Sequence, residues 1–117
     1  MTEKSIPINF TVECLEKPLK QKQVTATIRG GNYISKYGLK AGEKIEVKYK
    51  RKRIGFAVIK DIYLIGYFDL FDPEIVRKEG FDSSDELISV LKQFWKWHWN
   101  NIVDGKQKMP IIEFEWM

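Results

Sequence analysis

Alternation of hydrophobic and polar positions predicts β-strands in several parts of the chain. In these segments every second residue is apolar, or β-branched residues dominate, as is typical of strands. They lie at residues 5–13, 24–29, 43–49, 54–67 and 110–116. Residues 30–42 contain four glycines and are expected to form a loop. The pattern therefore predicts five or six short strands.

Two helices are expected between the last two strands. Asp72 followed by Pro73 is a typical helix start, and Gly80 is suited to the left-handed conformation that ends a helix. Ser83 with Glu86 three residues later has the spacing of a capping box, so a second helix is expected to begin near Ser84. Together these elements predict an α+β fold, a small β-barrel with two helices inserted before the final strand.

The second predicted helix carries an aromatic cluster. At about 100° per residue, Leu87, Leu91, Phe94 and His98 fall on one line, which predicts that this line faces the core. On this prediction His98 is a core histidine rather than a general base. Trp97 and Trp99 lie on opposite flanks of the line and cannot both be central. The cluster is either core packing or, where one of these tryptophans faces solvent, a stacking platform for a nucleic-acid base. Residues 100–109 are expected to form a loop.

Composition limits the class of protein. The chain has 117 residues, 44% hydrophobic and 31% charged, which fits one folded domain over residues 1–117 and excludes disorder. No apolar run is long enough to cross a membrane, and Met1–Lys4 lacks a signal-peptide pattern, so a cytoplasmic protein without membrane contact is expected. With Cys14 and His98 as the only residues of their kinds, we expect no Cys/His zinc site and no cofactor.

Charge is unevenly distributed along the chain. Residues 1–60 hold 14 Lys and Arg against 5 Asp and Glu, whereas residues 61–117 hold 6 against 11. This asymmetry favours an anionic partner, with RNA the first candidate. The densest run of cations is a predicted turn that contains Lys48, Lys50, Arg51, Lys52 and Arg53. It is either a phosphate-binding site or a solvated hairpin tip that protects strand edges.

Polar side chains share one face of the strand at residues 24–29. Thr25, Thr27 and Arg29 alternate with apolar residues, so they point to the same side. Glu79 ends the first predicted helix, where a carboxylate opposes the helix dipole. It is either held by a partner, for which Arg29 is the natural candidate, or an ordinary surface glutamate.

The order of these motifs resembles the ASCH family of the PUA-like superfamily. The similarity lies in the Thr25-Ala26-Thr27-Ile28-Arg29 strand, a glycine before the next strand, the Glu79-Gly80 pair between the helices and a final Ile-Glu-Phe strand. The resemblance covers roughly residues 6–116. It implies a PUA-like barrel with a cleft beside the inserted helices and a role in RNA binding. Some ASCH members are enzymes: one branch hydrolyses N-acetylated cytidine with a lysine, a threonine and a glutamate, and another is reported to cut RNA.

Three hypotheses follow. The preferred one is RNA or nucleotide binding, with Thr25, Arg29, the basic turn, Trp97 and Trp99 as contacts. The second is a nucleoside- or RNA-processing hydrolase that uses Thr27 and Glu79, which match the family pattern, and Lys22. The family's lysine position holds Val24, and Lys22 lies two residues earlier. The third is a module that binds an acidic protein partner.

Overall fold

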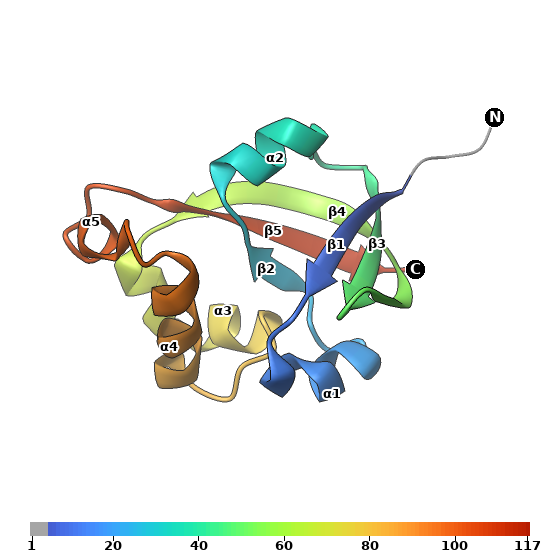
Figure 1. The fold of residues 1–117 in the computed structure, drawn as a ribbon, viewed down its shortest axis with the longest axis horizontal. Helices are drawn as coiled ribbons and strands as arrows, with labels where there is room; N and C mark the ends of the chain where they lie inside the picture. Colours follow the sequence, from blue (N-terminus) through green and yellow to red (C-terminus); the bar gives the residue numbers. More distant parts are fainter. Residues whose placement is uncertain (1–4) are drawn as a thin grey trace.

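The computed structural model describes residues 5–117; Met1–Lys4, where no signal-peptide pattern was found, lie outside the described residues. Five strands form one mixed sheet in the order β1-β3-β4-β5-β2 (Figure 1). Their bounds are β1 Ile6–Phe10, β2 Ala26–Ile28, β3 Lys44–Tyr49, β4 Lys52–Ile65 and β5 Met109–Trp116. β1 runs parallel to β3, and the other three neighbouring pairs are antiparallel.

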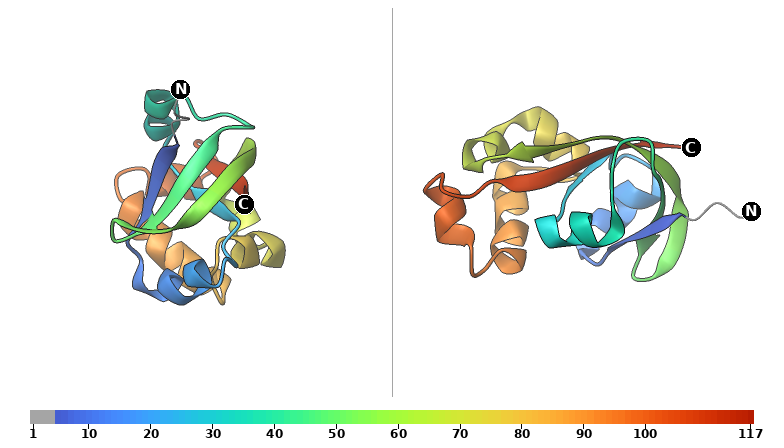
Figure 2. Two further views of the ribbon diagram at one scale, coloured as in Figure 1. Left: turned by 90° about the vertical axis from the view of Figure 1, so that its right-hand side faces the viewer. Right: turned by 90° about the horizontal axis from the view of Figure 1, so that it is seen from above.

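The sheet is curled into a half-barrel because β4 is long and bent. The first part of β4 pairs with β3 and the later part with β5, and the register shifts near Gly55 and again between Ile59 and Asp61. Irregularities of this kind bend a strand and increase its twist. Figure 2 shows the resulting curvature. β1 and β2 are the edge strands, and the α+β class is confirmed.

Five α-helices and two 3-10 turns complete the structure of residues 5–117. Their bounds are η1 Glu13–Leu15, α1 Glu16–Lys20, α2 Gly31–Tyr37, η2 Tyr67–Phe71, α3 Pro73–Lys78, α4 Ser84–Phe94 and α5 Trp99–Val103. α1, α3 and α4 lie in the lower part of Figure 1, and α2 lies in its upper part.

The two predicted helices before the last strand are confirmed as α3 and α4. The side chain of Asp72 accepts a hydrogen bond from the N–H of Glu74, and that of Ser83 accepts one from Glu86. These caps satisfy backbone donors that have no partner inside the helix.

Two segments expected to be loops contain short helices. In residues 30–42, the glycines flank α2: Gly30 precedes it, and Gly38 ends it with φ of 59°. The glycine content therefore marked the ends of a helix rather than a loop. α4 ends at Phe94 because the backbone leaves the helical conformation at Trp95. The short helix α5 then begins after His98.

The core lies between the concave face of the sheet and the helices. Ile8 and Ile45 from the parallel strand pair, Phe114 from β5 and Leu87 from α4 are at most 1% exposed. This arrangement places α3 beside the edge strand β2, and α4 packs against α3 and η2.

Candidate functional site

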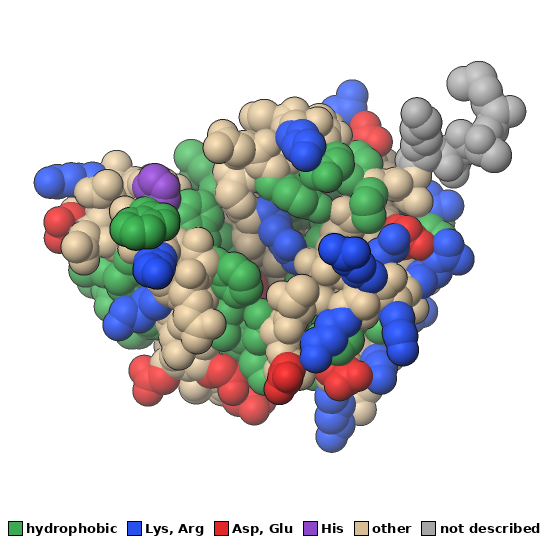
Figure 3. Space-filling view, in the orientation of Figure 1, with side chains coloured by type: hydrophobic (Ala, Val, Ile, Leu, Met, Phe, Trp, Pro, Cys, Tyr) green, Lys and Arg blue, Asp and Glu red, His purple; other side chains and the backbone are tan. Residues whose placement is uncertain are grey.

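A cleft of about 730 Å³ lies between the two edge strands and α4. Its volume is within the range of small-ligand sites. The lining from the strand side includes the polar residues Asn9, Thr11, Thr27 and Arg29, with Glu79 from the end of α3. The lining from the α4 side includes Leu87, Val90, Leu91, Phe94 and Trp95. Figure 3 shows the hollow near the middle of this face, with hydrophobic side chains in it. The cleft thus has a polar end and an apolar wall.

Arg29 is fixed at the polar end by bonds to both edge strands. Its Nε donates to Oγ1 of Thr27 at 3.3 Å, and its Nη2 donates to the carbonyl of Asn9 at 3.1 Å. The guanidinium also stacks on the rings of Phe10 and Tyr33, with distances to the centroids of 4.8 and 5.8 Å. Burial lowers the pKa of Arg29, and the nearby Tyr33 and Glu79 oppose that shift. Arg29 stays cationic, as arginine does throughout the physiological range.

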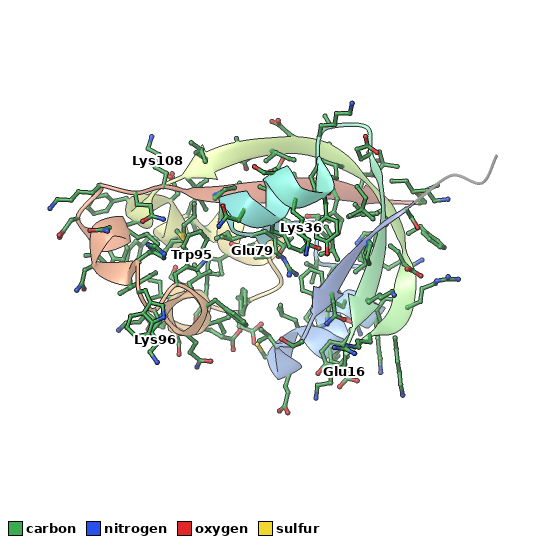
Figure 4. The ribbon with its side chains drawn as sticks, turned by 45° about the horizontal axis from the view of Figure 1, so that its top comes forward. Glu16, Lys36, Glu79, Trp95, Lys96 and Lys108 are labelled. Carbon is green, nitrogen blue, oxygen red and sulfur yellow. The ribbon has the colours of Figure 1, made fainter. Side chains whose placement is uncertain are left out.

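Glu79 lies at the end of α3 and is 4% exposed (Figure 4). The backbone N–H of Ile28 hydrogen-bonds its carboxyl group. Its Oε2 has no hydrogen-bond partner among residues 5–117. Burial raises the pKa of Glu79 to about 8, against the smaller lowering effects of the Ile28 N–H and the charge of Arg29. The carboxyl is therefore largely neutral at pH 7.

The expectation that Arg29 holds Glu79 directly needs correction. The hydrogen bonds of the guanidinium go to Thr27 and Asn9, and its effect on Glu79 is an attraction between charges. Glu79 is also not a surface residue, because it is almost completely buried. Desolvation thus dominates over the arginine's charge, which leaves a neutral acid beside a cation.

Gly80 explains why Glu79 reaches the cleft. It has φ of 89°, which L-residues rarely adopt, and a Cβ at this position would lie 2.7 Å from Cγ2 of Val24. The backbone of α3 therefore approaches the segment before β2 too closely for any side chain. This close approach brings Glu79 under the N–H of Ile28 on β2.

Two residues predicted for the site lie outside the cleft lining. β2 begins only at Ala26, and Thr25 before it uses its backbone, donating to Lys78 and accepting from Phe114. Lys22 lies against Gly55, with its Nζ 5.8 Å from the centroid of the Trp116 ring. The structure therefore brings Thr27, Arg29 and Glu79 together and leaves Thr25 and Lys22 apart from them.

The predicted basic turn connects β3 and β4. Lys50 and Arg51 both have positive φ, 47° and 69°, although neither is glycine. Three of the five cations form ion pairs: Lys48 and Arg53 with Glu46, and Lys50 with Glu13. Among the described residues, Arg51 and Lys52 form no ion pair. Figure 3 shows Lys and Arg side chains gathered on the right of this face, over the part of the molecule where the β3–β4 hairpin lies.

The turn is attached to the strand that lines the cleft. The backbone N–H of Arg51 donates to Oδ1 of Asn9 at 2.7 Å, and that of Lys50 donates to the carbonyl of Phe10 at 2.8 Å. Asn9 therefore contacts the turn through its side chain and Arg29 through its backbone. No sequence pattern marks Asn9, because both contacts depend on how the chain folds.

The aromatic cluster is less buried than the helical pattern predicted. α4 ends at Phe94, so Phe94 is 65% and Trp97 85% exposed, and His98 is exposed at the cleft instead of in the core. Trp95 lines the cleft (Figure 4), whereas Trp99 is half-buried and packs edge-on against Tyr67. Of Trp97 and Trp99, Trp97 is the one that faces solvent.

The cleft lining also includes Lys108, just before β5, which belongs to none of the sequence motifs. A cluster of three or more His, Cys, Asp or Glu residues that could bind a metal is not found in residues 5–117. Over the same residues no helix is long and apolar enough to span a bilayer.

Comparisons with known proteins show the fold. A scan against protein-family models and a search of curated proteins found no match. The solved structures include a similar hypothetical protein, PH0355, with a TM-score of 0.66 and 16% identity, over 97% of this chain and 100% of that one. Protein EF3133 from Enterococcus faecalis V583, described as a DUF984 family member, has a TM-score of 0.65 and 12% identity, over 100% and 82% of the two chains. The chain therefore shares its half-barrel fold with these two proteins.

Proposed function

We propose that this protein is an ASCH-type domain that binds RNA or a nucleotide, with a base in the cleft and phosphates on the basic turn. The observation that carries the proposal is the convergence of Thr27, Arg29 and Glu79 at the polar end of a ligand-sized cleft. A base or nucleotide suits this site because it combines a flat apolar surface with an edge of hydrogen-bonding groups. The ASCH resemblance supports the same proposal, since Thr27, Arg29 and Glu79 match its motifs.

In this proposal the polar end of the cleft forms hydrogen bonds with the ligand, and the apolar wall stacks on its base. Arg29 uses one N–H on Thr27 and one on Asn9, and the rest of its five donors are available to a phosphate or a carbonyl. Trp95 and Phe94 on the opposite wall provide aromatic surface for stacking, and Trp97 extends it into solvent. Base–aromatic stacking contributes about 1–3 kcal/mol per base.

The basic turn supplies the phosphate contacts. Arg51 and Lys52 carry charges that no described acidic residue pairs with, and they lie on the hairpin that Asn9 ties to the cleft. A strand with one base in the cleft could thus place neighbouring phosphates near the turn. Each phosphate neutralised on single-stranded nucleic acid adds about 0.7 to the slope of log affinity against log salt.

The hydrolase hypothesis receives less support. Its three residues do not converge, since Lys22 lies on Trp116 outside the cleft while Thr27 and Glu79 line it. A positioned nucleophile or base must lie within about 3–3.5 Å of the reacting atom. Binding is therefore the better-supported function, and a turnover assay on N-acetylated cytidine and on RNA tests the alternative.

The proposal is tested by anisotropy of short labelled single-stranded RNA over a salt series. Arg51→Gln with Lys52→Gln is expected to weaken binding and to lower the salt slope by about 1.4, which corresponds to two phosphate contacts. Lys40→Gln with Lys60→Gln is the matched control, because it removes the same charge from exposed positions away from the cleft lining. Equal losses in both double variants, or affinity independent of salt, would contradict the proposal.

A further inference from the structure

The unpartnered oxygen of Glu79 indicates how the cleft selects its ligand. Glu79 is 4% exposed, and its carboxyl receives the Ile28 N–H on one oxygen while Oε2 faces no partner among the described residues. A buried polar atom without a partner carries a penalty of about 1–3 kcal/mol. A ligand that completes this hydrogen bond removes the penalty.

The neighbours of Oε2 determine which kind of hydrogen bond it makes. Besides Glu79, the charged or titratable residues in the cleft lining are Arg29, directly after β2, and His98 and Lys108 at the exposed end. Tyr33 on α2 lies against Arg29. The strand β1 contributes the uncharged Asn9 and Phe10 to the lining, and the lining residues of α4 are all apolar, with Phe94 among them. Burial outweighs the attraction of Arg29 and keeps a proton on the carboxyl. The oxygen next to Ile28 accepts a hydrogen bond, so the proton belongs on Oε2.

We propose that Glu79 binds the ligand as a neutral carboxylic acid, with Oε2 donating to an acceptor atom such as an unprotonated ring nitrogen of a base. This inference rests on the proposed function and assigns the role of one of its residues. Thr27 and Arg29 are also donors, so the polar end of the cleft presents donors to the ligand from three sides. The matching ligand is a planar group whose edge is rich in acceptors.

Binding is then linked to a proton. Ionised Glu79 can no longer donate from Oε2, so only the neutral fraction of the protein binds, and the apparent affinity falls with that fraction. With a midpoint of about 8, the affinity at pH 9 is expected to be about one tenth of that at pH 7. Near pH 9 each binding event is expected to take up almost one proton.

The test uses calorimetry of adenosine and cytidine with the whole chain. Neither nucleoside changes its protonation between about pH 7 and about pH 9, so any pH dependence belongs to the protein. Measurements at pH 9 in two buffers with different ionisation enthalpies give the number of protons taken up. Glu79→Gln keeps a donor that does not ionise, so it is expected to bind with the same affinity at both pH values. Glu79→Ala removes the donor and is expected to bind weakly at both.

His98→Gln is the control for an effect of the imidazole. The affinity of this variant is expected to fall about tenfold between pH 7 and pH 9, as it does in the unmodified protein. Equal affinity of the unmodified protein at pH 7 and pH 9 would overturn the donor role while leaving the proposed function intact. Loss of binding in Glu79→Gln at pH 7, to the level of Glu79→Ala, would do the same. Failure of both nucleosides to bind the unmodified protein at pH 7 would overturn nucleotide binding itself, and the donor role with it.

Discussion

Arg29 donates through Nη2 to the backbone carbonyl of Asn9, 3.1 Å away, and this bond joins the two edge strands of the half-barrel. The partners are 20 residues apart in sequence. Asn9 in turn accepts the N–H of Arg51 through its side chain. The polar end of the cleft and the basic turn are therefore connected through one residue of β1, which places both parts of the proposed ligand site on one rigid frame.

Arg29→Lys is expected to weaken nucleotide binding by at least about tenfold and to reduce the free energy of unfolding by about 1–3 kcal/mol. Lysine keeps the charge, but a single ammonium does not reproduce the flat guanidinium that bonds Thr27 and Asn9 while it stacks on Phe10. Urea unfolding and calorimetry measure the two effects. Arg77→Lys is the control, because Arg77 is exposed and pairs only with Glu74 among the described residues. A lysine variant that behaves like this control would contradict the assigned role.

Glu79 is expected to make stability depend on pH in an identifiable way. Its pKa is about 8 in the folded protein and 4.5 for an unperturbed glutamate carboxyl, so between these values the folded state holds a proton that the unfolded state has released. The contribution of Glu79 to the free energy of unfolding is therefore largest below about pH 4.5 and falls as the pH rises to about 8. The free energy of unfolding relative to Glu79→Gln should fall by about 1.4 kcal/mol per pH unit in this range.

Denaturant unfolding of both proteins at a series of pH values measures this difference. Other carboxyl groups titrate in both proteins, so they cancel when the two curves are subtracted. A constant difference between pH 5 and pH 8 would show that Glu79 ionises normally in the folded state.

Gly80→Ala is expected to destabilise the fold by about 2–4 kcal/mol, because the new Cβ would meet Val24 at 2.7 Å and the residue must adopt φ of 89°. Gly105→Ala separates the two causes. Gly105 has a similar φ of 78° but open space around it, so only the backbone strain of about 1–2 kcal/mol is expected there. Thermal unfolding compares the two variants, and equal losses would contradict the close approach of Gly80 to Val24.

Replacing Lys50 and Arg51 by Asn and Gly is expected to stabilise the protein by about 1–2 kcal/mol while weakening RNA binding. Both residues have positive φ in a two-residue hairpin, a conformation for which Asn-Gly is the preferred sequence. The glycine keeps the N–H that Asn9 accepts. Unfolding and anisotropy measurements on the same variant are decisive: a gain in stability with unchanged binding would indicate that the two cations do not contact the ligand.

Trp97 and Trp99 are expected to separate binding from stability. Trp97 is 85% exposed, so Trp97→Ala should change the free energy of unfolding by less than about 0.5 kcal/mol while weakening binding of single-stranded RNA. Trp99 packs on Tyr67, so Trp99→Ala should cost about 2 kcal/mol or more. Unchanged RNA affinity in Trp97→Ala would remove Trp97 from the proposed interface.

The strands and the first two helices after β4 were predictable because their signals are local. Alternating residues mark β3, and the caps at Asp72 and Ser83 mark the starts of α3 and α4. The same reasoning failed after Phe94. Helical periodicity extended the apolar line to His98, whereas α4 ends at Phe94 in the structure. Trp95 and Trp99 pack against the core, and Phe94 and Trp97 are exposed.

The sequence by itself determined the approximate position of each strand, that Thr27 and Arg29 share a face, and that cations gather in one turn, because these properties depend on neighbours along the chain. Tertiary structure alone decided that Glu79 is buried under the N–H of Ile28, that Lys22 lies on Trp116, and that Asn9 links Arg29 to the turn. Contacts of this kind join residues far apart in sequence. They follow from the curvature of the sheet and the close packing at Gly80, which no local pattern encodes.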